Sequence, residues 1–544
     1  MELLLTLFTA IATSLAIVPV MIRLAPWLGM VDQPSARKVH QFPIPRVGGW
    51  GIVFGALVAV VLWAPFDPLV LSYIFGVCVL FVFGAWDDRR ELGHYTKFIG
   101  QLIAVLPIVT IAGLYVVDFP FIQDDSVIPA GYAMLFSMLA LMGMANAINH
   151  SDGLDGLAGG ESTLSLVAIA FLAYLADGDL AVLIALAVLG GLFGFLRYNT
   201  HPAVVFMGDN GSQAIGFSLG VLAILLTQRI DPTLSPAVAV LLLGLPVADI
   251  LYVLYQRISE GNNWFKATKN HVHHRLIERG FTHKEAVVII YSIQIGFVGS
   301  GILLRHASDW LLAGVYLGGC AVVFGFLSVA ERTGWRMKRR AREIIQKRLL
   351  SRERRKTLLV AAPRRFLEIA IPGYLVFASI GINDLTAPFG FVALGLLAGL
   401  LFHIFMGREP RSLARRSLLF GVGGLVVYLS FTQPGPVTAL SQWIHYLFFA
   451  LVAVAVIMAI HFNPGQRKLE FEATAMDYLI VLLVLIPLLV IGPIYQSSSG
   501  FLVALLVLMY ALELLVTERR EHRAFIGPSA VIAASVLVIK GLLV

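Results

Sequence analysis

Charged residues are scarce in this chain, and their scarcity defines its class. Only 13% of the 544 residues are Asp, Glu, Lys or Arg, whereas 58% are apolar and the mean hydropathy is +0.84. A soluble domain carries about twice that charged fraction. The apolar residues form runs of about 17–22 residues, long enough to cross a bilayer as helices, and they lack the alternation of barrel strands. The composition therefore predicts an all-α polytopic membrane protein.

Cysteine is nearly absent as well. Cys78 and Cys320 both lie in apolar runs, so we expect neither a disulfide framework nor a thiolate-bound metal. The first run begins at Met1–Leu4 with no basic segment before it and no small-residue cleavage site, so we expect it to stay as a membrane helix. The net charge of +7 is explained by basic loops on one face, so no nucleic-acid partner is expected.

The apolar runs predict two membrane domains. Residues 1–330 hold about eleven predicted spans and residues 366–544 about seven, and residues 331–365 form a basic segment that we interpret as a cytoplasmic linker. Alternation of the spans brings five polar loops to one face: residues 26–49, 87–97, 146–160, 197–212 and 256–284. Lys and Arg are concentrated in the first, second and last of these loops. The positive-inside rule then places this face in the cytoplasm and the N-terminus outside.

The most polar stretch at a predicted membrane edge is residues 146–160, NAINHSDGLDGLAGG. It contains Asn146, Asn149, Asp152 and Asp155. Polar groups at membrane depth are costly and are functional by default, and the glycines among them allow a backbone to approach a phosphate closely. The alternative is an ordinary turn between two helices with an Asx cap.

Three further carboxylates suit a metal ion. Asp87 and Asp88 follow the third span, and because neighbouring helix positions point about 100° apart, we expect them to have different partners. Asp209 lies between glycines in FMGDNGS. Mg²⁺ is usually held by one or two carboxylates with water and substrate phosphate, which Asp209 with Asp87 or Asp88 would supply. Exposed acids at a helix end, and an ordinary turn, are the alternatives.

Basic and imidazole side chains gather in the last polar loop. His271, His273, His274 and Arg275 form HVHHR among further Lys and Arg residues. Such donors suit an anion, so phosphate binding is expected; a solvated basic loop and a zinc site are the alternatives. Lys38 in the first loop either binds lipid phosphate or only adds to the excess of positive charge on cytoplasmic loops. Carboxylates for Mg²⁺ beside cations for phosphates suit phosphoryl transfer onto or off a lipid.

Five motifs in this order carry a family resemblance: DQPSARKVH with PRVGG, DDRREL, NAINHSDGLDGLAGG, FMGDNGS and HVHHR. Over about residues 1–330 they resemble the polyprenyl-phosphate N-acetylhexosamine-1-phosphate transferases, glycosyltransferase family 4. The resemblance implies a bacterial inner-membrane enzyme in which undecaprenyl phosphate attacks the sugar-linked phosphate of a UDP-N-acetylhexosamine and UMP leaves. The product would be the first lipid-diphosphate sugar of a surface polysaccharide such as the O-antigen of lipopolysaccharide.

The resemblance also implies a cofactor and a set of site residues. The cofactor would be Mg²⁺, or Mn²⁺, held by Asp209 and Asp88, with Asp87, Asp88 and Asp209 as the catalytic residues. The HxHHR form resembles the N-acetylglucosamine branch and favours UDP-N-acetylglucosamine as the donor. The expected substrate-binding residues are Lys38, Asn146, Asn149, Asp152, Asp155, His271, His273, His274 and Arg275.

A membrane transporter or lipid translocase is the alternative from another class, using the same phosphate-binding loops for binding alone. It predicts ionisable residues deep within the spans and repeated halves. The acids of residues 1–330 are instead expected at span ends. The sequence leaves homo-oligomerisation open, and residues 366–544 resemble no family; we expect them to serve packing or partner recruitment.

Overall fold

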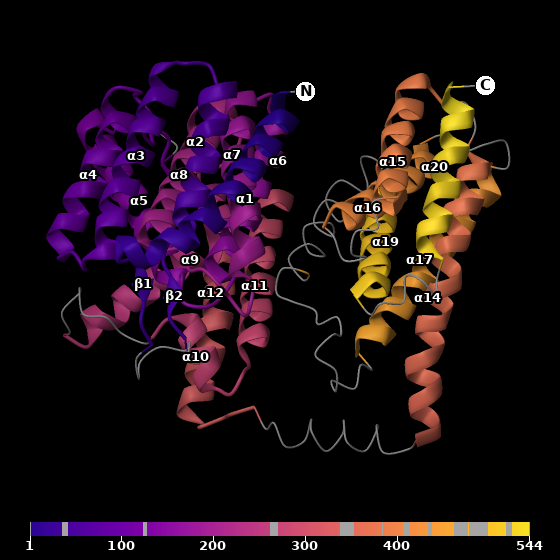
Figure 1. The fold of residues 1–544 in the computed structure, drawn as a ribbon. Coiled ribbons are helices and arrows are strands. Elements are labelled where there is room, and N and C mark those ends of the chain that lie inside the picture. Colours follow the sequence, from indigo (N-terminus) through magenta and orange to yellow (C-terminus); the bar gives the residue numbers. More distant parts are fainter. Residues whose placement is uncertain are drawn as a thin grey trace. The chain divides into compact units, whose positions relative to one another are not determined.

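The structure is a computed structural model that describes residues 2–34, 42–122, 128–261, 270–337, 353–382, 385–405, 413–432, 438–461, 477, 499–517 and 525–542. Almost all of these residues are helical (Figure 1). The chain divides into two compact units, one built on Met1–Lys338 and the other on Arg339–Ala473 with Val484–Val544. Ten of the described helices are long and apolar enough to span a membrane, so the predicted all-α polytopic class is confirmed.

The first unit contains one helix for each of the eleven predicted spans. Nine of them are among the ten long candidate spans, and α2 and α4 are shorter. The eleven are α1 (Glu2–Leu28), α2 (Gly48–Trp63), α3 (Pro68–Arg89), α4 (His94–Thr110), α5 (Ala130–Ser151), α6 (Leu157–Leu175), α7 (Asp179–Asn199), α8 (Asp209–Leu225, extended by the π-helical turn Leu226–Ile230), α9 (Val238–Ser259), α11 (His283–Leu303) and α12 (Asp309–Arg332).

Local signals set where several of these helices begin. Asp67 caps α3 by accepting a hydrogen bond from the Val70 amide at 2.7 Å, and Pro68 occupies the first helical position, where no amide hydrogen is needed. Thr282 and Glu285 form a reciprocal capping box at the start of α11. These caps fix the register of the residues that follow, His283 among them.

Helix α8 is the centre of the first unit. Every residue from Asn210 to Leu225 is buried, and the helix packs against α2, α3, α5, α6, α7 and α9. Beside it, α1, α2 and α7 pack closely through small residues. A Cβ at Gly191 would lie 2.5 Å from the Ile52 carbonyl oxygen, so only glycine allows this approach. The N-terminus of α8 is therefore held in a tightly packed frame.

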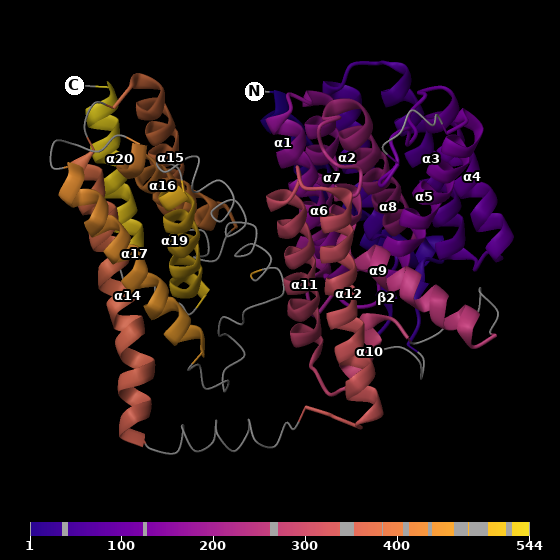
Figure 2. The same ribbon diagram turned by 180° about the vertical axis from the view of Figure 1, so that it is seen from behind.

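Helix α9 is broken near its middle. Gly244 has φ 53° and ψ −125°, and Pro246 follows it. Gln294 of α11 occupies the break: its Oε1 accepts from the Leu245 amide at 2.8 Å, and its Nε2 donates to Ser165 Oγ at 2.9 Å. A buried amide thus satisfies backbone that the break leaves unpaired, as a membrane interior requires. Figure 2, which views the protein from behind, shows α11 and α12 side by side.

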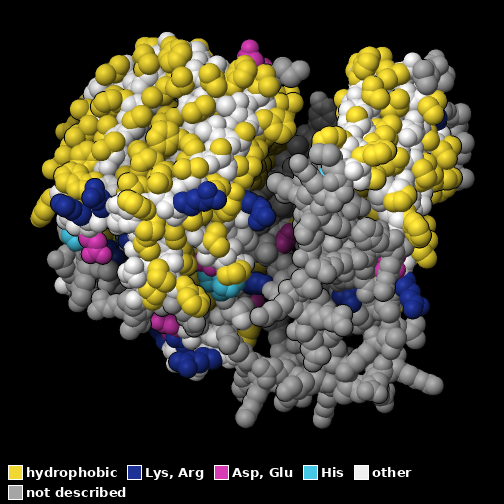
Figure 3. All heavy atoms as spheres, in the orientation of Figure 1, with side chains coloured by type: hydrophobic (Ala, Val, Ile, Leu, Met, Phe, Trp, Pro, Cys, Tyr) yellow, Lys and Arg dark blue, Asp and Glu magenta, His cyan; other side chains and the backbone are white. Residues whose placement is uncertain are grey.

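The predicted polar loops gather at one end of the first unit. There β1 (Val31–Asp32) pairs antiparallel with β2 (Ile44–Pro45), and the short helix α10 (Val272–Glu278) lies nearby (Figure 1). Apolar side chains cover the upper part of this unit in Figure 3, and Lys and Arg lie beneath them, toward that end. The central loop is shorter than predicted, because α5 continues to Ser151 and α6 begins at Leu157.

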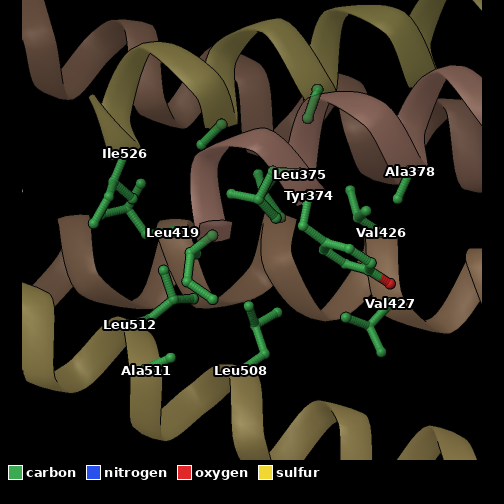
Figure 4. Close-up of a cluster of buried hydrophobic side chains, with 14 of the residues drawn as sticks. Tyr374, Leu375, Ala378, Leu419, Val426, Val427, Leu508, Ala511, Leu512 and Ile526 are labelled. Carbon is green, nitrogen blue, oxygen red and sulfur yellow. The ribbon is translucent and has the colours of Figure 1, made fainter. Parts of the chain in front are cut away.

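The second unit contains six helices in the described part of the chain, where about seven spans were predicted. They are α14 (Glu353–Gly381), α15 (Ala387–Phe405), α16 (Leu413–Thr432), α17 (Thr438–His461), α19 (Ser499–Thr517) and α20 (Ile526–Leu542). Leucine, valine and alanine fill its core around Tyr374 (Figure 4), whose hydroxyl is 2.9 Å from Ser430 Oγ. Residues 338–352 of the predicted linker lie outside the described residues.

Candidate active site

Two carboxylates share one ammonium group at the start of α8. Lys97 of α4 donates from Nζ to Asp209 Oδ2 at 2.8 Å and lies 2.7 Å from Asp87 Oδ2 of α3. Asn149 of α5 donates from Nδ2 to Asp209 Oδ1 at 3.0 Å and to Ser212 Oγ at 2.9 Å. Two acids this close would repel each other without a cation. The site therefore has a place for positive charge between Asp87 and Asp209.

Asp88 has a different environment from its neighbour. Its Oδ1 accepts from the Asp209 amide at 2.9 Å, and its Oδ2 accepts from the amide and the side-chain Nδ2 of Asn210 at 3.2 and 2.7 Å. The carboxylate thus binds the positive end of the α8 dipole. A Cβ at Gly208, where φ is +77°, would lie 2.6 Å from Asp88 Oδ2, so this approach needs glycine.

The three acids have different surroundings in this structure, and which of them hold a metal ion stays a prediction. Asp88 was expected to share a metal ion with Asp209, but both of its oxygens are engaged by N–H groups of α8. Asp87 is the acid whose free oxygen meets the same cation as Asp209, while its Oδ1 accepts from the Leu92 amide at 2.7 Å. Asp88 supports Asp209 through the backbone.

A group of amide side chains lies behind Asp209. Gln101 Nε2 donates to Asn146 Oδ1 at 3.2 Å and to Gln213 Oε1 at 3.1 Å, and Asn146 Nδ2 donates back to Gln101 Oε1 at 2.9 Å. Gln213 Nε2 reaches Asp209 Oδ2 at 3.5 Å. Asn146, predicted to bind substrate, is therefore part of this network and is connected to Asp209 through Gln101 and Gln213.

The loop between α5 and α6 carries Asp152, which is half-buried. Burial, together with the charges of Asp209 and Asp155, raises the pKa of Asp152 to about 7. The group is then partly protonated at neutral pH. A cation bound nearby would favour the ionised form of Asp152. The charge of this loop would therefore depend on whether a cation is bound at Asp209.

Asp155 lies at the other end of the same loop and is held firmly. Its Oδ2 is 2.6 Å from His201 Nδ1 and accepts from the Ala203 amide at 3.1 Å. Burial opposes ionisation, but these hydrogen bonds hold the pKa of Asp155 below its ordinary value. The next residue, Gly156, donates its amide to Asn199 Oδ1 at 2.8 Å and accepts from Tyr291 Oη at 2.7 Å.

The imidazoles of the HVHHR motif lie close together but differ in their hydrogen bonds. His271 Nδ1 is 2.7 Å from Asp249 Oδ2, and Asp249 Oδ1 also accepts from the Val272 amide at 3.0 Å. The rings of His150 and His271 stack with centroids 5.2 Å apart. His273 is buried, and its Nε2 has no hydrogen-bond partner among the residues that the structure describes. Burial and the neighbouring His274 and His271 keep the pKa of His273 well below its ordinary value, so it is neutral.

Arg275 does not join the other motif residues. Its guanidinium is buried, with Nε 2.6 Å from Glu331 Oε1 and Nη2 3.1 Å from Glu331 Oε2, and it lies 5.3 Å from the centre of the Tyr252 ring. This bidentate pair ties α10 to α12. Arg275 thus pairs with Glu331 in this structure, and its phosphate contact stays a prediction. Lys38, also predicted, lies outside the described residues.

Several site residues were missed from the sequence. Lys97 is the last residue of the polar loop 87–97, but no role was predicted for it, and Gln101 follows it by one helical turn. Glu161 and Asp249 lie within α6 and α9, so acids of the first unit are not confined to span ends as expected. A lone acid inside an apolar helix is itself a signal of function or pairing, and it would have found Asp249.

The fold and the site define a polytopic membrane protein whose acids, amides and imidazoles meet at one end of its helices. The family model for glycosyl transferase family 4 matches residues 70–227. A Bacillus subtilis protein named "Probable undecaprenyl-phosphate N-acetylglucosaminyl 1-phosphate transferase" is 34% identical over 304 residues, which are 56% of this chain and 85% of the relative. The chain therefore belongs to glycosyl transferase family 4, as its motifs predicted, and it is a membrane transferase.

Other relatives have related names. The decaprenyl-phosphate N-acetylglucosaminephosphotransferase of Mycobacterium leprae is 32% identical over 336 residues, 56% of this chain and 84% of the relative. The undecaprenyl-phosphate alpha-N-acetylglucosaminyl 1-phosphate transferase of Salmonella typhi is 26% identical over 336 residues, 60% of this chain and 90% of the relative.

Proposed function

We propose that this protein transfers N-acetylglucosamine 1-phosphate from UDP-N-acetylglucosamine to undecaprenyl phosphate and releases UMP. The names of the relatives support the sugar phosphate and the polyprenyl acceptor. The observation that carries the proposal is the cation position between Asp87 and Asp209 at the start of α8. Transfer between two phosphates needs such charge neutralisation and positioning more than covalent chemistry.

In the proposed reaction an oxygen of the lipid phosphate attacks the sugar-linked phosphorus of the donor. The bond from that phosphorus to the bridging oxygen breaks, and UMP leaves with the electron pair. Asp209 and Asp87 fit Mg²⁺ or Mn²⁺, because an ammonium group already bridges these hard oxygen donors. The metal, when bound, would neutralise the phosphate oxygens.

The surrounding residues have proposed roles that follow from their contacts. Asn149 holds Asp209 in orientation, and Asp88 fixes the start of α8 that carries it. Lys97 would be available to contact a substrate phosphate if a metal took the place of its ammonium group between Asp87 and Asp209. His273 packs on the Asp152–Gly156 loop, since a Cβ at Gly153 would lie 2.1 Å from its Nε2; we propose that this nitrogen binds the nucleotide phosphates.

The proposed location is a bacterial inner membrane, with this end of the helices in the cytoplasm and the N-terminus outside. The Lys and Arg residues beneath the apolar belt in Figure 3 support this orientation. Both substrates suit it, because UDP-sugars are cytoplasmic and the lipid carrier presents its phosphate at the membrane surface.

The test is UMP release by the purified full-length protein in detergent with undecaprenyl phosphate, Mg²⁺ and a panel of UDP-sugars. We expect release that depends on the lipid and occurs with UDP-N-acetylglucosamine. Release with a different UDP-sugar alone would keep the reaction and change the donor. A folded sample that releases no UMP with any donor would contradict the proposal.

Asp249→Asn is expected to lower the transfer rate by about ten- to a hundredfold while the fold is kept, which is the scale for a buried hydrogen bond to a charged group. The amide oxygen can still accept from the Val272 amide, but the NH₂ group meets the Nδ1–H of His271. His271 must then turn or change tautomer. Its Nε2 then points in another direction or changes from hydrogen-bond acceptor to donor. The measurements are initial rate and melting temperature.

The matched control is Asp231→Asn, which changes an acid of the loop between α8 and α9 whose carboxylate caps the nearby Thr233. Its rate should equal that of the unchanged protein. Asp249→Ala removes both hydrogen bonds and should lower the melting temperature as well. An Asp249→Asn protein with an unaltered rate and pH profile would show that Asp249 only caps α10.

A further inference from the structure

A second group of metal-ligating side chains lies apart from the Asp87–Lys97–Asp209 cluster. Asp155, His201 and His283 each offer one ligand atom, and these atoms all lie within 4.8 Å of one another. They come from three places in the chain: the α5–α6 loop, the turn after α7, and the first residue of α11. Among the described residues, no other group of three His, Cys, Asp or Glu side chains is arranged in this way.

We propose that Asp155, His201 and His283 form a binding site for Zn²⁺ or a similar divalent metal ion that accepts both nitrogen and oxygen donors. Two imidazole nitrogens and one carboxylate oxygen are a donor set that suits Zn²⁺, which leaves a position for water in a four-coordinate site. Mg²⁺ prefers oxygen donors alone. The two clusters at this end of the protein therefore differ in the metal they select, and this inference does not depend on the proposed transfer reaction.

The backbone around the three ligands is already fixed. The Ala203 amide holds the Asp155 carboxylate at 3.1 Å, and Asn199 and Tyr291 anchor the adjoining Gly156 from both sides. The capping box of Thr282 and Glu285 sets the start of α11 directly before His283. Hydrogen bonds behind the ligands that hold them in place are a regular feature of protein metal sites.

The side chains can reach a common ion with a small rearrangement. His201 Nδ1 is now 2.6 Å from Asp155 Oδ2, and His283 Nε2 is 3.4 Å from the Asp155 carbonyl oxygen. The two rings are stacked, with centroids 4.3 Å apart and planes inclined by 22°. Binding requires one ring to turn about its Cβ–Cγ bond so that both nitrogens face the ion. Both side chains are partly exposed, so neither ring is completely enclosed by its neighbours.

A metal here would have a definite structural effect. It would tie the start of α11 and the turn after α7 to the loop that carries Asp152, replacing the proton that now lies between His201 and Asp155. Metal binding to the folded chain alone raises the melting temperature as metal is added. Stability that increases with added Zn²⁺ is therefore a readout separate from transferase activity.

The experiment uses full-length, tag-free protein in detergent that has been treated with EDTA and then desalted. Zn²⁺ is added, unbound metal is removed, and zinc is counted by elemental analysis beside the melting temperature. We expect about one zinc ion per chain and a higher melting temperature. His201→Ala and His283→Ala should both lose the zinc, and His306→Ala, at an exposed histidine between α11 and α12, should keep it.

Cobalt gives a second test that needs no substitution. Co²⁺ added to the unchanged protein should give the visible absorption of a four-coordinate nitrogen–oxygen site, and Zn²⁺ should displace it. Zinc that remains in both His201→Ala and His283→Ala would place the metal elsewhere, for example at HVHHR. That result, or an unchanged protein that binds neither metal, would overturn the inference even if the variants fold poorly.

Discussion

Asp209→Asn is expected to reduce the transfer rate by about a thousandfold or more, equivalent to roughly 4 kcal/mol in the activation barrier. The substitution keeps the shape of the side chain and removes its charge, so the cation position between Asp87 and Asp209 loses half of its negative charge. The backbone amide of residue 209 still donates to Asp88, so α8 should begin at the same place. The measurements are UMP release at saturating Mg²⁺ and the melting temperature.

Asp179→Asn is the matched control, because Asp179 is also the first residue of an apolar helix, α7, and is exposed. It should have the rate of the unchanged protein. If Asp209→Asn kept more than about a tenth of the rate, a loss of under 1.4 kcal/mol, Asp209 could not be a ligand of an essential metal.

The helices of the first unit were predictable because each span needs its own apolar run. The apolar runs of residues 69–86 and 50–63, for example, lie within α3 and α2, which add only a few residues at their ends. The gathering of the polar loops at one end follows from alternation alone. These features depend on the thickness and polarity of the bilayer and on local composition. Local composition can be read directly from a sequence.

The pairing of charges within the site was not predictable in the same way. Lys97 and Asp209 are 112 residues apart in the chain, and nothing local distinguishes Lys97 from the basic residues that precede it. Arg275 shows the opposite case, in which a local motif does suggest a partner. The HVHHR motif suggests that Arg275 binds phosphate, but in the structure the carboxylate of Glu331, 56 residues later, accepts two hydrogen bonds from its guanidinium. Only the packing of α10 against α12 decides which anion that guanidinium meets.

The length of the central loop was overestimated for a related reason. Asn146 and Asn149 favour turns when considered alone, and a stretch rich in them was expected to be a loop. Inside α5 the Asn146 side chain donates to the Met142 carbonyl at 2.8 Å and meets Gln101, and Asn149 meets Asp209. Partners on neighbouring helices satisfy these amides, so the helix continues to Ser151.

Lys97→Met is expected to change how the protein responds to Mg²⁺ as well as its rate. Without metal, Asp87 and Asp209 lose the ammonium group that joins them, and the two carboxylates repel each other. Removing one partner from a charged hydrogen bond costs about 2 kcal/mol, so the melting temperature in EDTA should fall by several degrees. If Lys97 also contacts a substrate phosphate, the transfer rate should fall by about a hundredfold, roughly 2.7 kcal/mol.

The discriminating measurement is the rise in melting temperature caused by Mg²⁺ in each protein. In the unchanged protein the metal must displace the Lys97 ammonium, whereas in Lys97→Met it meets two uncompensated acids. Mg²⁺ should therefore stabilise the variant more than the unchanged protein, and at lower concentration. Lys284→Met, which changes a lysine in the first turn of α11, serves as the control and should respond as the unchanged protein does. Equal Mg²⁺ responses in Lys97→Met and the unchanged protein would show that the ammonium and the metal occupy different places. Asp87 could then no longer be assigned as the second metal ligand.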